Sequence, residues 1–368
     1  MRNRFITKLI DLAHHNDKLI LVVGDLGYNV VEPFADLFPD RFLNAGVSEQ
    51  NMMGLAAGLA SEGMHVFVYS IANFPLFRCA EQIRNDVDYH NLPVTIVSVG
   101  GGLAYGALGY SHHALQDYAL IRTLPNMLIA SPGDPQEVEG CLDFLNENPQ
   151  PSYLRLGKSG EKEYHSKIPK PKPGLWQTVK ESPIGSSAPT LITTGAVLQS
   201  AMEWSKHPKL KDFQIKSLPI WGLASKKNQI EQVMSTEGIV ITVEDHLFDA
   251  GFGSWMKESL GGNAEAESRL RHIALTSEVF EISVNASIIN TRDMSLSLGF
   301  NYDTYDQTIT DFNLPAYRVG DARLYMKNNV QYGSMWGTVW AKNTSMLPAG
   351  AQSKASEFQV NDDGYLVW

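Results

Sequence analysis

Residues 41–60 read RFLNAGVSEQNMMGLAAGLA, and this stretch decides the fold. From 51 to 63 the small and apolar residues recur at helical spacing and end on Gly63, which predicts a helix. Upstream, LILVVGD (19–25) is a short apolar run that predicts a buried strand. Glu49 therefore lies at a strand-to-helix junction, where α/β sheets commonly bind ligands. The alternative is that Glu49 is only a first-turn acid that favours the helix N-terminus.

The remainder of the first 165 residues repeats this alternation of strand and helix. Short apolar runs predict strands at 65–70, 93–100 and 126–132, and helical patterns predict helices at 79–90 and 135–146. Strands that alternate with helices are typical of parallel βαβ units. We therefore predict an α/β fold with a doubly wound parallel sheet over residues 1–165.

Three further regions follow in the chain. Residues 166–188 are polar and proline-rich, which predicts an exposed linker. Residues 189–280 show a second, smaller series of strands and helices, which predicts another parallel sheet. Residues 281–368 alternate apolar and polar residues without helical runs, which predicts a β-rich tail. A fusion and an accessory β-domain are both open interpretations of that tail.

Composition limits the class of protein. The 368 residues are 43% hydrophobic, which indicates a globular chain, and the net charge of −10 argues against a nucleic-acid partner. No apolar run reaches membrane-spanning length, and the N-terminus lacks the apolar core of a secretory signal. The two cysteines, Cys79 and Cys141, have no metal-ligand spacing. We expect a cytoplasmic protein with a small-molecule or protein partner, and no membrane or metal site of its own.

The Gly46-Val47-Ser48-Glu49 element resembles the Gly-x-x-Glu element of the pyrimidine-binding region of transketolase and deoxyxylulose-phosphate synthase. The resemblance runs from about residue 5 to 280 and does not include the tail. It implies that Glu49 is both catalytic and cofactor-binding, because the family's glutamate hydrogen-bonds N1′ of the aminopyrimidine of thiamine diphosphate and thereby activates the coenzyme. Region 189–280 is then similar to the smaller transketolase C-terminal domain.

The segment YSIANFPLFRCAEQIRND (69–86) resembles the family's aromatic segment. By that match Phe74 stacks on the aminopyrimidine ring and Phe77 helps to wall the pocket, as aromatic faces do for flat heterocycles. Arg78, the next residue, is expected to bind substrate. The alternative for either phenylalanine is ordinary core packing.

The loop GGGLAYGALGYSHHALQD (100–117) resembles the family's substrate loop. His112, in Gly109-Tyr110-Ser111-His112, matches a histidine that contacts the sugar and can move protons near neutral pH. His113 is either a second substrate ligand or a structural residue. The loop carries Gly100 and Leu108 where many transketolases have a histidine and an acid that grip donor-sugar hydroxyls. This departure leaves coenzyme activation untouched but weighs against the usual pentose-phosphate substrate.

A third block, PSYLRLGKSG (151–160), places Arg155 where the family has an arginine that faces the substrate phosphate. A planar guanidinium suits that task because it can hold phosphate oxygens in pairs. The alternative is a solvated arginine at a strand end. Glu244, Asp245 and His246 match a conspicuous acidic stretch of the C-terminal domain and receive no catalytic role.

The chain lacks the Gly-Asp-Gly and Asn element with which thiamine enzymes bind the Mg²⁺ or Ca²⁺ that holds the diphosphate. It therefore resembles the C-terminal half of a split transketolase, inactive alone, with a homodimeric core and an N-terminal-half subunit that holds the metal. The resemblance implies transfer of a two-carbon ketol unit between sugar phosphates. A deoxyxylulose-phosphate synthase, a 2-oxoacid dehydrogenase β-subunit and a non-catalytic binding protein are the alternatives.

Overall fold

The computed structural model describes residues 1–275, 282–290, 295–302, 317–318, 325–326, 359–360 and 366–367. The chain divides into two compact units, Met1–Glu278 and Val279–Trp368. In the described part of the second unit the strands form three antiparallel pairs, the longest between β13 and β14. These strands are β13 (Ile282–Asn290), β14 (Ser295–Tyr302), β15 (Tyr317–Arg318), β16 (Tyr325–Met326), β17 (Gln359–Val360) and β18 (Leu366–Val367).

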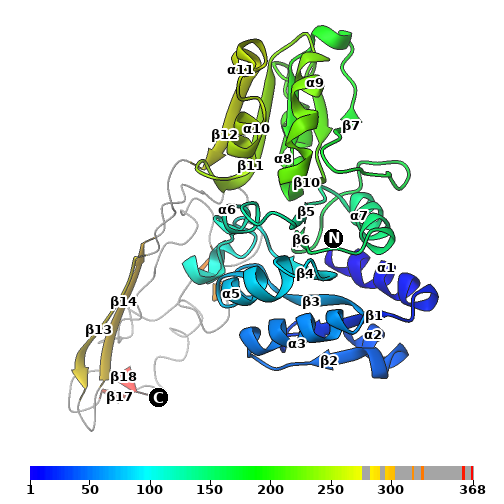
Figure 1. Cartoon of the computed structure of the whole chain (residues 1–368). Coiled ribbons are helices and arrows are strands. Elements are labelled where there is room, and N and C mark those ends of the chain that lie inside the picture. Colours follow the sequence, from blue (N-terminus) through cyan, green and yellow to red (C-terminus); the bar gives the residue numbers. More distant parts are fainter. Residues whose placement is uncertain are drawn as a thin grey trace. The chain divides into compact units, whose positions relative to one another are not determined.

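The larger sheet of the first unit has seven strands in the order β10-β5-β6-β4-β3-β1-β2 (Figure 1). All neighbours are parallel except β10, which is antiparallel to β5. Every residue of β4, β5 and β6 is buried, as expected for central strands that are covered on both faces. The bounds are β1 (Leu19–Val23), β2 (Phe42–Asn44), β3 (His65–Ile71), β4 (Val94–Val99), β5 (Leu128–Ala130), β6 (Ser152–Leu156) and β10 (Ile220–Gly222).

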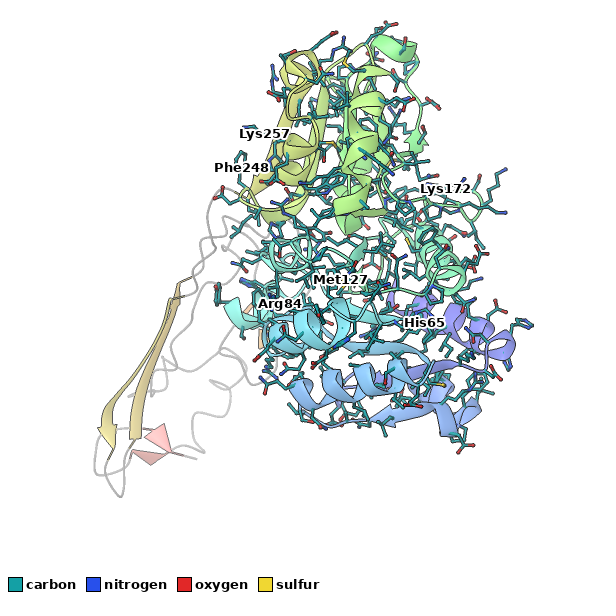
Figure 2. The ribbon with its side chains drawn as sticks, viewed as in Figure 1. His65, Arg84, Met127, Lys172, Phe248 and Lys257 are labelled. Atoms are coloured by element: carbon teal, nitrogen blue, oxygen red, sulfur yellow. The ribbon has the colours of Figure 1, made fainter. Side chains whose placement is uncertain are left out.

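Helices cover both faces of this sheet, which confirms the predicted doubly wound α/β fold. One apolar core contains side chains of α1 (Arg2–His15), α2 (Glu32–Leu37) and α7 (Pro135–Glu147). The other contains side chains of α3 (Glu49–Ser61), η2 (Ile83–Asp88) and α6 (Asp117–Ile121). This second core continues into the smaller sheet through Met127, labelled in Figure 2, and Trp221. The short helices nearby are η1 (Pro39–Arg41), α4 (Phe74–Phe77), α5 (Ala80–Gln82), η3 (Gly106–Leu108) and η4 (Tyr110–His112).

The smaller sheet has the order β12-β11-β8-β9-β7, and its strands are parallel except for β7. The strands are β7 (Gln177–Lys180), β8 (Thr190–Thr193), β9 (Gln214–Ser217), β11 (Val240–Leu247) and β12 (Leu270–Leu275). The helices are α8 (Leu198–Trp204), α9 (Gln229–Met234), α10 (Phe252–Ser259) and α11 (Ala264–Arg269), with short turns η5 (Gly185–Ser187), η6 (Gly195–Val197) and η7 (Leu223–Asn228). None of the helices in the described part of the chain is long and apolar enough to cross a membrane.

Two features differ from a simple two-domain picture. The segment predicted as a linker, 166–188, contains β7, which pairs with β9 at the edge of the smaller sheet. The run 213–221 is divided at Pro219, a residue without a backbone N–H for a continuous ladder. Its first half is β9, whereas its second half, β10, pairs with β5 of the larger sheet. The two sheets are therefore joined by a shared segment.

The helices differ from their predicted bounds near the site. The helix predicted at 51–63 begins at Glu49 and ends at Ser61, with Gly63 at a φ of +91° just beyond it. The helix predicted at 79–90 is instead a short α-helix, α5, followed by the π-helical turn η2. Such i→i+5 turns are rare and occur often at functional sites.

Candidate active site

The backbone around residues 44–49 places Glu49 at the carboxyl edge of the larger sheet. The Asn44 side chain accepts from the backbone N–H of Asp25 at 3.1 Å and of Gly46 at 3.0 Å, and donates to Asp25 Oδ1 at 2.9 Å. Gly46 has a φ of +73°, a conformation in which side-chain-bearing residues are strained. This turn leads from β2 into α3, so Glu49 lies in the first turn of a helix that follows a strand.

Glu49 and Phe74 are joined by Arg78. The Glu49 side chain is 5% exposed, and Arg78 Nη1 donates to its Oε1 at 2.5 Å. The guanidinium carbon of Arg78 lies 4.2 Å from the centroid of the Phe74 ring, a cation–π contact. The Arg78 side chain is 47% exposed. A nearly buried carboxylate, a ring face and a partly solvated arginine therefore meet at one point.

A cavity of 460 Å³ opens beside this point. It is lined by two short segments, the 73–78 region around α4 and the end of the 100–117 loop: Asn73, Phe74, Phe77, Arg78, Tyr110, Ser111, His113 and Gln116. His112 stands next to them, because its ring centroid lies 5.2 Å from that of Phe74 in an edge-on arrangement. The structure thus brings together six of the predicted site residues, Glu49, Phe74, Phe77, Arg78, His112 and His113.

Polar atoms at the cavity have unused hydrogen-bonding capacity. His113 is buried, and its Nε2–H donates to the Gly106 carbonyl at 3.1 Å, which leaves Nδ1 as an acceptor. His113 Nδ1 and Asn73 Oδ1 have no hydrogen-bond partner among the described residues. Asn73 Nδ2 donates to the His113 carbonyl and holds the two segments together. Two neighbouring residues of the cavity lining therefore each keep one buried acceptor atom without a partner among the described residues.

Arg155 lies elsewhere, at the junction of the two sheets. It is 2% exposed, and its Nε donates to Asp117 Oδ2 and its Nη1 to Asp245 Oδ1, both at 2.6 Å. Its Nη2 donates to the Ala114 carbonyl at 3.0 Å, and its guanidinium lies over the Tyr118 ring. Burial would lower the pKa of Arg155, but the two carboxylates outweigh it and hold the pKa well above its usual value. Because these donors face protein acceptors, the phosphate-binding role of Arg155 stays a prediction.

The acidic stretch near β11 has structural contacts. Glu244 accepts the backbone N–H groups of Phe252 at 2.6 Å and Gly253 at 2.9 Å, and thus caps the start of α10. His272 Nε2 lies 2.7 Å from the same carboxylate. The Asp245 contact with Arg155 is a site feature that sequence reasoning missed; its only local signal was an acid at the carboxyl end of a strand.

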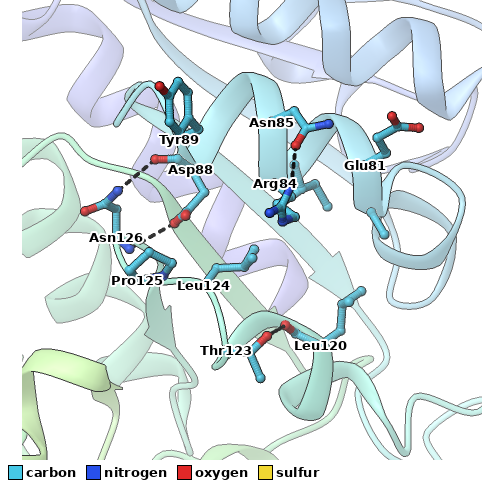
Figure 3. Close-up of a pocket in the computed structure, with 12 residues that line it drawn as sticks. Glu81, Arg84, Asn85, Asp88, Tyr89, Leu120, Thr123, Leu124, Pro125 and Asn126 are labelled. Carbon is cyan, nitrogen blue, oxygen red and sulfur yellow. Dashed lines mark hydrogen bonds between the residues drawn. The ribbon is translucent and has the colours of Figure 1, made fainter.

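Two larger cavities, each of 720 Å³, lie away from this cluster. One lies between η2 and the 120–126 segment, where the backbone N–H of Asn126 donates to Asp88 Oδ1 at 3.0 Å (Figure 3). The other lies between α7 and residues 168–173, near Lys172 in Figure 2. Neither is lined by a predicted site residue.

No group of three or more His, Cys, Asp or Glu side chains in the described ranges is arranged to hold a metal ion. Cys79 and Cys141 are both buried. Burial raises the pKa of the Cys79 thiol to about 12, with a contribution from Glu49, and raises the pKa of the Cys141 thiol well above its usual value. Neither thiol is therefore poised as a nucleophile.

Comparison with known proteins identifies the family of the chain. Residues 1–161 match the family described as the transketolase pyrimidine binding domain. The chain is 31% identical over 265 residues to a subunit of the apulose-4-phosphate transketolase of Phocaeicola vulgatus, covering 71% of this chain and 84% of that protein. It is 32% identical to a putative transketolase C-terminal section of Methanocaldococcus jannaschii, covering 74% and 85%.

Among solved structures, a split-gene transketolase described as an inactive β4 tetramer superposes with a TM-score of 0.65. That chain is 30% identical, and the match covers 75% of this chain and 89% of the other. The transketolase of Leishmania mexicana, at 18% identity, a TM-score of 0.61 and coverage of 76% of this chain and 41% of that one, shares the fold.

Proposed function

The chain belongs to the transketolase family, with relatives that form one half of a split enzyme, and from this premise we propose that it is the C-terminal subunit of a split transketolase. In this proposal it transfers a two-carbon ketol unit between sugar phosphates, using thiamine diphosphate and a separately encoded N-terminal-half subunit. The observation that carries the proposal is that Arg78, which lines the cavity together with Phe74, contacts both the Glu49 carboxylate and the Phe74 ring.

The residues present fit the pyrimidine half of the coenzyme. When bound, thiamine diphosphate supplies the carbon nucleophile that carries the two-carbon unit. Glu49 offers a nearly buried carboxylate that can share a proton with a ring nitrogen, and Phe74 offers an aromatic face. His112 can hydrogen-bond to hydroxyl or carbonyl oxygens of a sugar, and His113 Nδ1 can accept from a sugar hydroxyl. Mg²⁺ or Ca²⁺ and the diphosphate would be held mainly by the partner subunit.

The names of the relatives support a sugar-phosphate substrate and a multi-chain enzyme, because two of them are subunits of an apulose-4-phosphate transketolase. A second candidate is a deoxyxylulose-phosphate synthase, since such an enzyme of Clostridium perfringens is 29% identical over 260 residues. The matched part is 41% of that enzyme. We propose that this chain assembles around a homodimeric core and is inactive without its partner.

The test is calorimetric titration of thiamine diphosphate with Mg²⁺ into this chain, a candidate N-terminal-half subunit, and their mixture. We expect binding and ketol transfer in the mixture alone. Activity of this chain by itself would overturn the split-site proposal. Formation of 1-deoxy-D-xylulose 5-phosphate in place of ketol transfer would favour the second candidate.

Glu49→Gln tests the proposed catalytic carboxylate in the same mixture. The amide keeps the size and an acceptor for Arg78 but cannot share a proton with the coenzyme, so we expect turnover to fall by at least about 100-fold. The control is Glu62→Gln, an exposed glutamate just beyond the other end of α3. Equal turnover for both variants would contradict the assignment of Glu49.

A further inference from the structure

Arg78 makes two contacts of the kind that a flat, hydrogen-bond-donating ligand would make. Its guanidinium is planar, and its N–H bonds lie in that plane. One N–H donates to Glu49 Oε1 at 2.5 Å, while the guanidinium carbon lies 4.2 Å from the Phe74 ring centroid.

The same two groups are those that the aminopyrimidine of thiamine diphosphate would use, a step that rests on the proposed function. Glu49 would face a ring nitrogen, and Phe74 would face the ring. The Arg78 guanidinium and the aminopyrimidine therefore need the same carboxylate and the same aromatic ring. His112 is not stacked in parallel on the Phe74 ring, because the interplanar angle between the two rings is 67°.

We propose that Arg78 is an internal substitute for the aminopyrimidine, which occupies the coenzyme site in the free subunit and must swing out before the coenzyme binds. The contact is autoinhibitory: it compensates a nearly buried carboxylate while the site is empty and reduces binding to the unassembled chain. An unpaired carboxylate at 5% exposure would be costly, so the exchange of Arg78 for the coenzyme keeps Glu49 partnered in both states.

The geometry allows such an exchange. The Arg78 side chain is 47% exposed and lines the cavity of 460 Å³, so its charge can return to water. Its backbone lies at the end of the four-residue helix α4, which Asn73 anchors through the His113 carbonyl. Only the side chain needs to rotate, because Phe74 and Glu49 are held by separate elements.

The test uses the full free chain and the probe 4-amino-5-hydroxymethyl-2-methylpyrimidine, the pyrimidine half of the coenzyme, at millimolar concentration by ligand-observed NMR. Arg78→Met keeps the aliphatic length and removes the guanidinium. If Arg78 blocks the site in about nine of ten molecules, the variant should bind the probe roughly tenfold more tightly than the wild type. The matched control is Arg84→Met. Arg84 is also an arginine of this segment, but its Nη1 donates to Asn85 Oδ1 and not to Glu49.

A second readout follows the wild type alone. The guanidinium NMR signals of Arg78, assigned by their loss in Arg78→Met, should move to solvent-like positions as the probe saturates the chain. A merely structural arginine would not move.

The outcomes separate the two proposals. Tighter binding by Arg78→Met alone supports the internal-substitute role. Equal binding by the wild type and Arg78→Met overturns that role and leaves the proposed function standing. Weaker binding by Arg78→Met overturns it also, because Arg78 would then be a ligand contact. Absence of binding to every variant of the free chain overturns the role of Arg78, because removal of the guanidinium then opens no site, and leaves the proposed function standing, because that function expects binding in the assembled mixture.

Discussion

Two arginine–carboxylate pairs in this chain have similar short contacts and opposite environments. Arg78 and Glu49 meet at 2.5 Å with side chains 47% and 5% exposed, whereas Arg155 and Asp117 meet at 2.6 Å with side chains 2% and 0% exposed. The first pair borders a cavity and the second lies at the junction of the two sheets. The resemblance to the family predicts both arginines as substrate ligands.

The difference lies in what else each arginine contacts. Arg155 has two carboxylates and a carbonyl as acceptors, and Asp117 also accepts from the Tyr153 hydroxyl at 2.7 Å. Arg78 has one carboxylate and one ring. A saturated, buried network resists exchange of partners, because any departure leaves an uncompensated charge. A pair that is half open to water can exchange one partner for a ligand.

The largest effect should follow from Arg155→Met. The variant leaves buried Asp117 without its cation, so we expect the free energy of unfolding to fall by about 3–5 kcal/mol. Urea denaturation of the first unit measures this, with Arg84→Met, an exposed arginine, as the control. A loss below about 1 kcal/mol, combined with a raised KM for a sugar phosphate, would instead favour the predicted phosphate-binding role.

A third buried carboxylate, Glu137, has no arginine partner among the described residues and extends the comparison of the two arginine–carboxylate pairs. Glu137 accepts the Gly133 backbone N–H at 2.7 Å and the Ser217 hydroxyl at 2.9 Å, while its Oε1 lies 3.7 Å from His165 Nε2 without a hydrogen bond. Burial raises the pKa of Glu137 to about 7. Burial lowers the pKa of His165, but its hydrogen bond to Asp134 and the charges of Glu137 and Asp134 together outweigh burial, and the pKa is raised.

Glu137→Gln should therefore change the pH dependence of stability. A carboxyl whose pKa is about 7 when folded and 4.5 when unfolded binds an extra proton in the folded state between these values, so stability falls as pH rises across that window. The raised pKa of His165 acts in the same direction, and because Glu137 is one of its causes, this contribution is smaller in the variant. The amide cannot ionise, so the variant should gain on the order of 3 kcal/mol over the wild type above pH 7 and almost nothing at pH 4.5.

Urea midpoints measured from pH 4.5 to 8 test this expectation. Glu147→Gln, on the exposed end of the same helix α7, should show the pH profile of the wild type. If Glu137→Gln were instead less stable at pH 8 than at pH 5, relative to the wild type, the sign would be wrong and Glu137 would be ionised when folded.

Continuous apolar runs made the core of the fold predictable. The runs 19–25 and 65–70 predicted β1 and β3 because continuous apolar residues suit strands that are buried on both faces. The strand directly before Glu49 is instead β2, a three-residue, partly exposed strand that no such run predicted. Local patterns could not show that Pro219 divides a run between two sheets, because that depends on which neighbour each half meets.

The contacts of the site depend on the strand order. Arg155 and Asp245 are 90 residues apart in sequence, and Arg78 and Glu49 are 29 apart. Such pairings follow from the order of strands in the sheet, which a single sequence does not contain. The residue types of the site were therefore predictable, whereas their partners were not.

The smallest effect should follow from Arg78→Met on stability. Arg78 lines the cavity, so water can reach the Glu49 carboxylate once the guanidinium is gone. In Arg155→Met, by contrast, Asp117 stays buried without a cation. We expect the free energy of unfolding to fall by no more than about 1 kcal/mol, in the range of partly exposed ion pairs. Urea denaturation of Arg78→Met and Arg155→Met under the same conditions compares the two losses of unfolding free energy directly. Equal losses for the two variants would mean that Glu49 depends on its arginine as much as Asp117 does. The Arg78–Glu49 pair would then exchange partners no more easily than the buried Arg155–Asp117 pair.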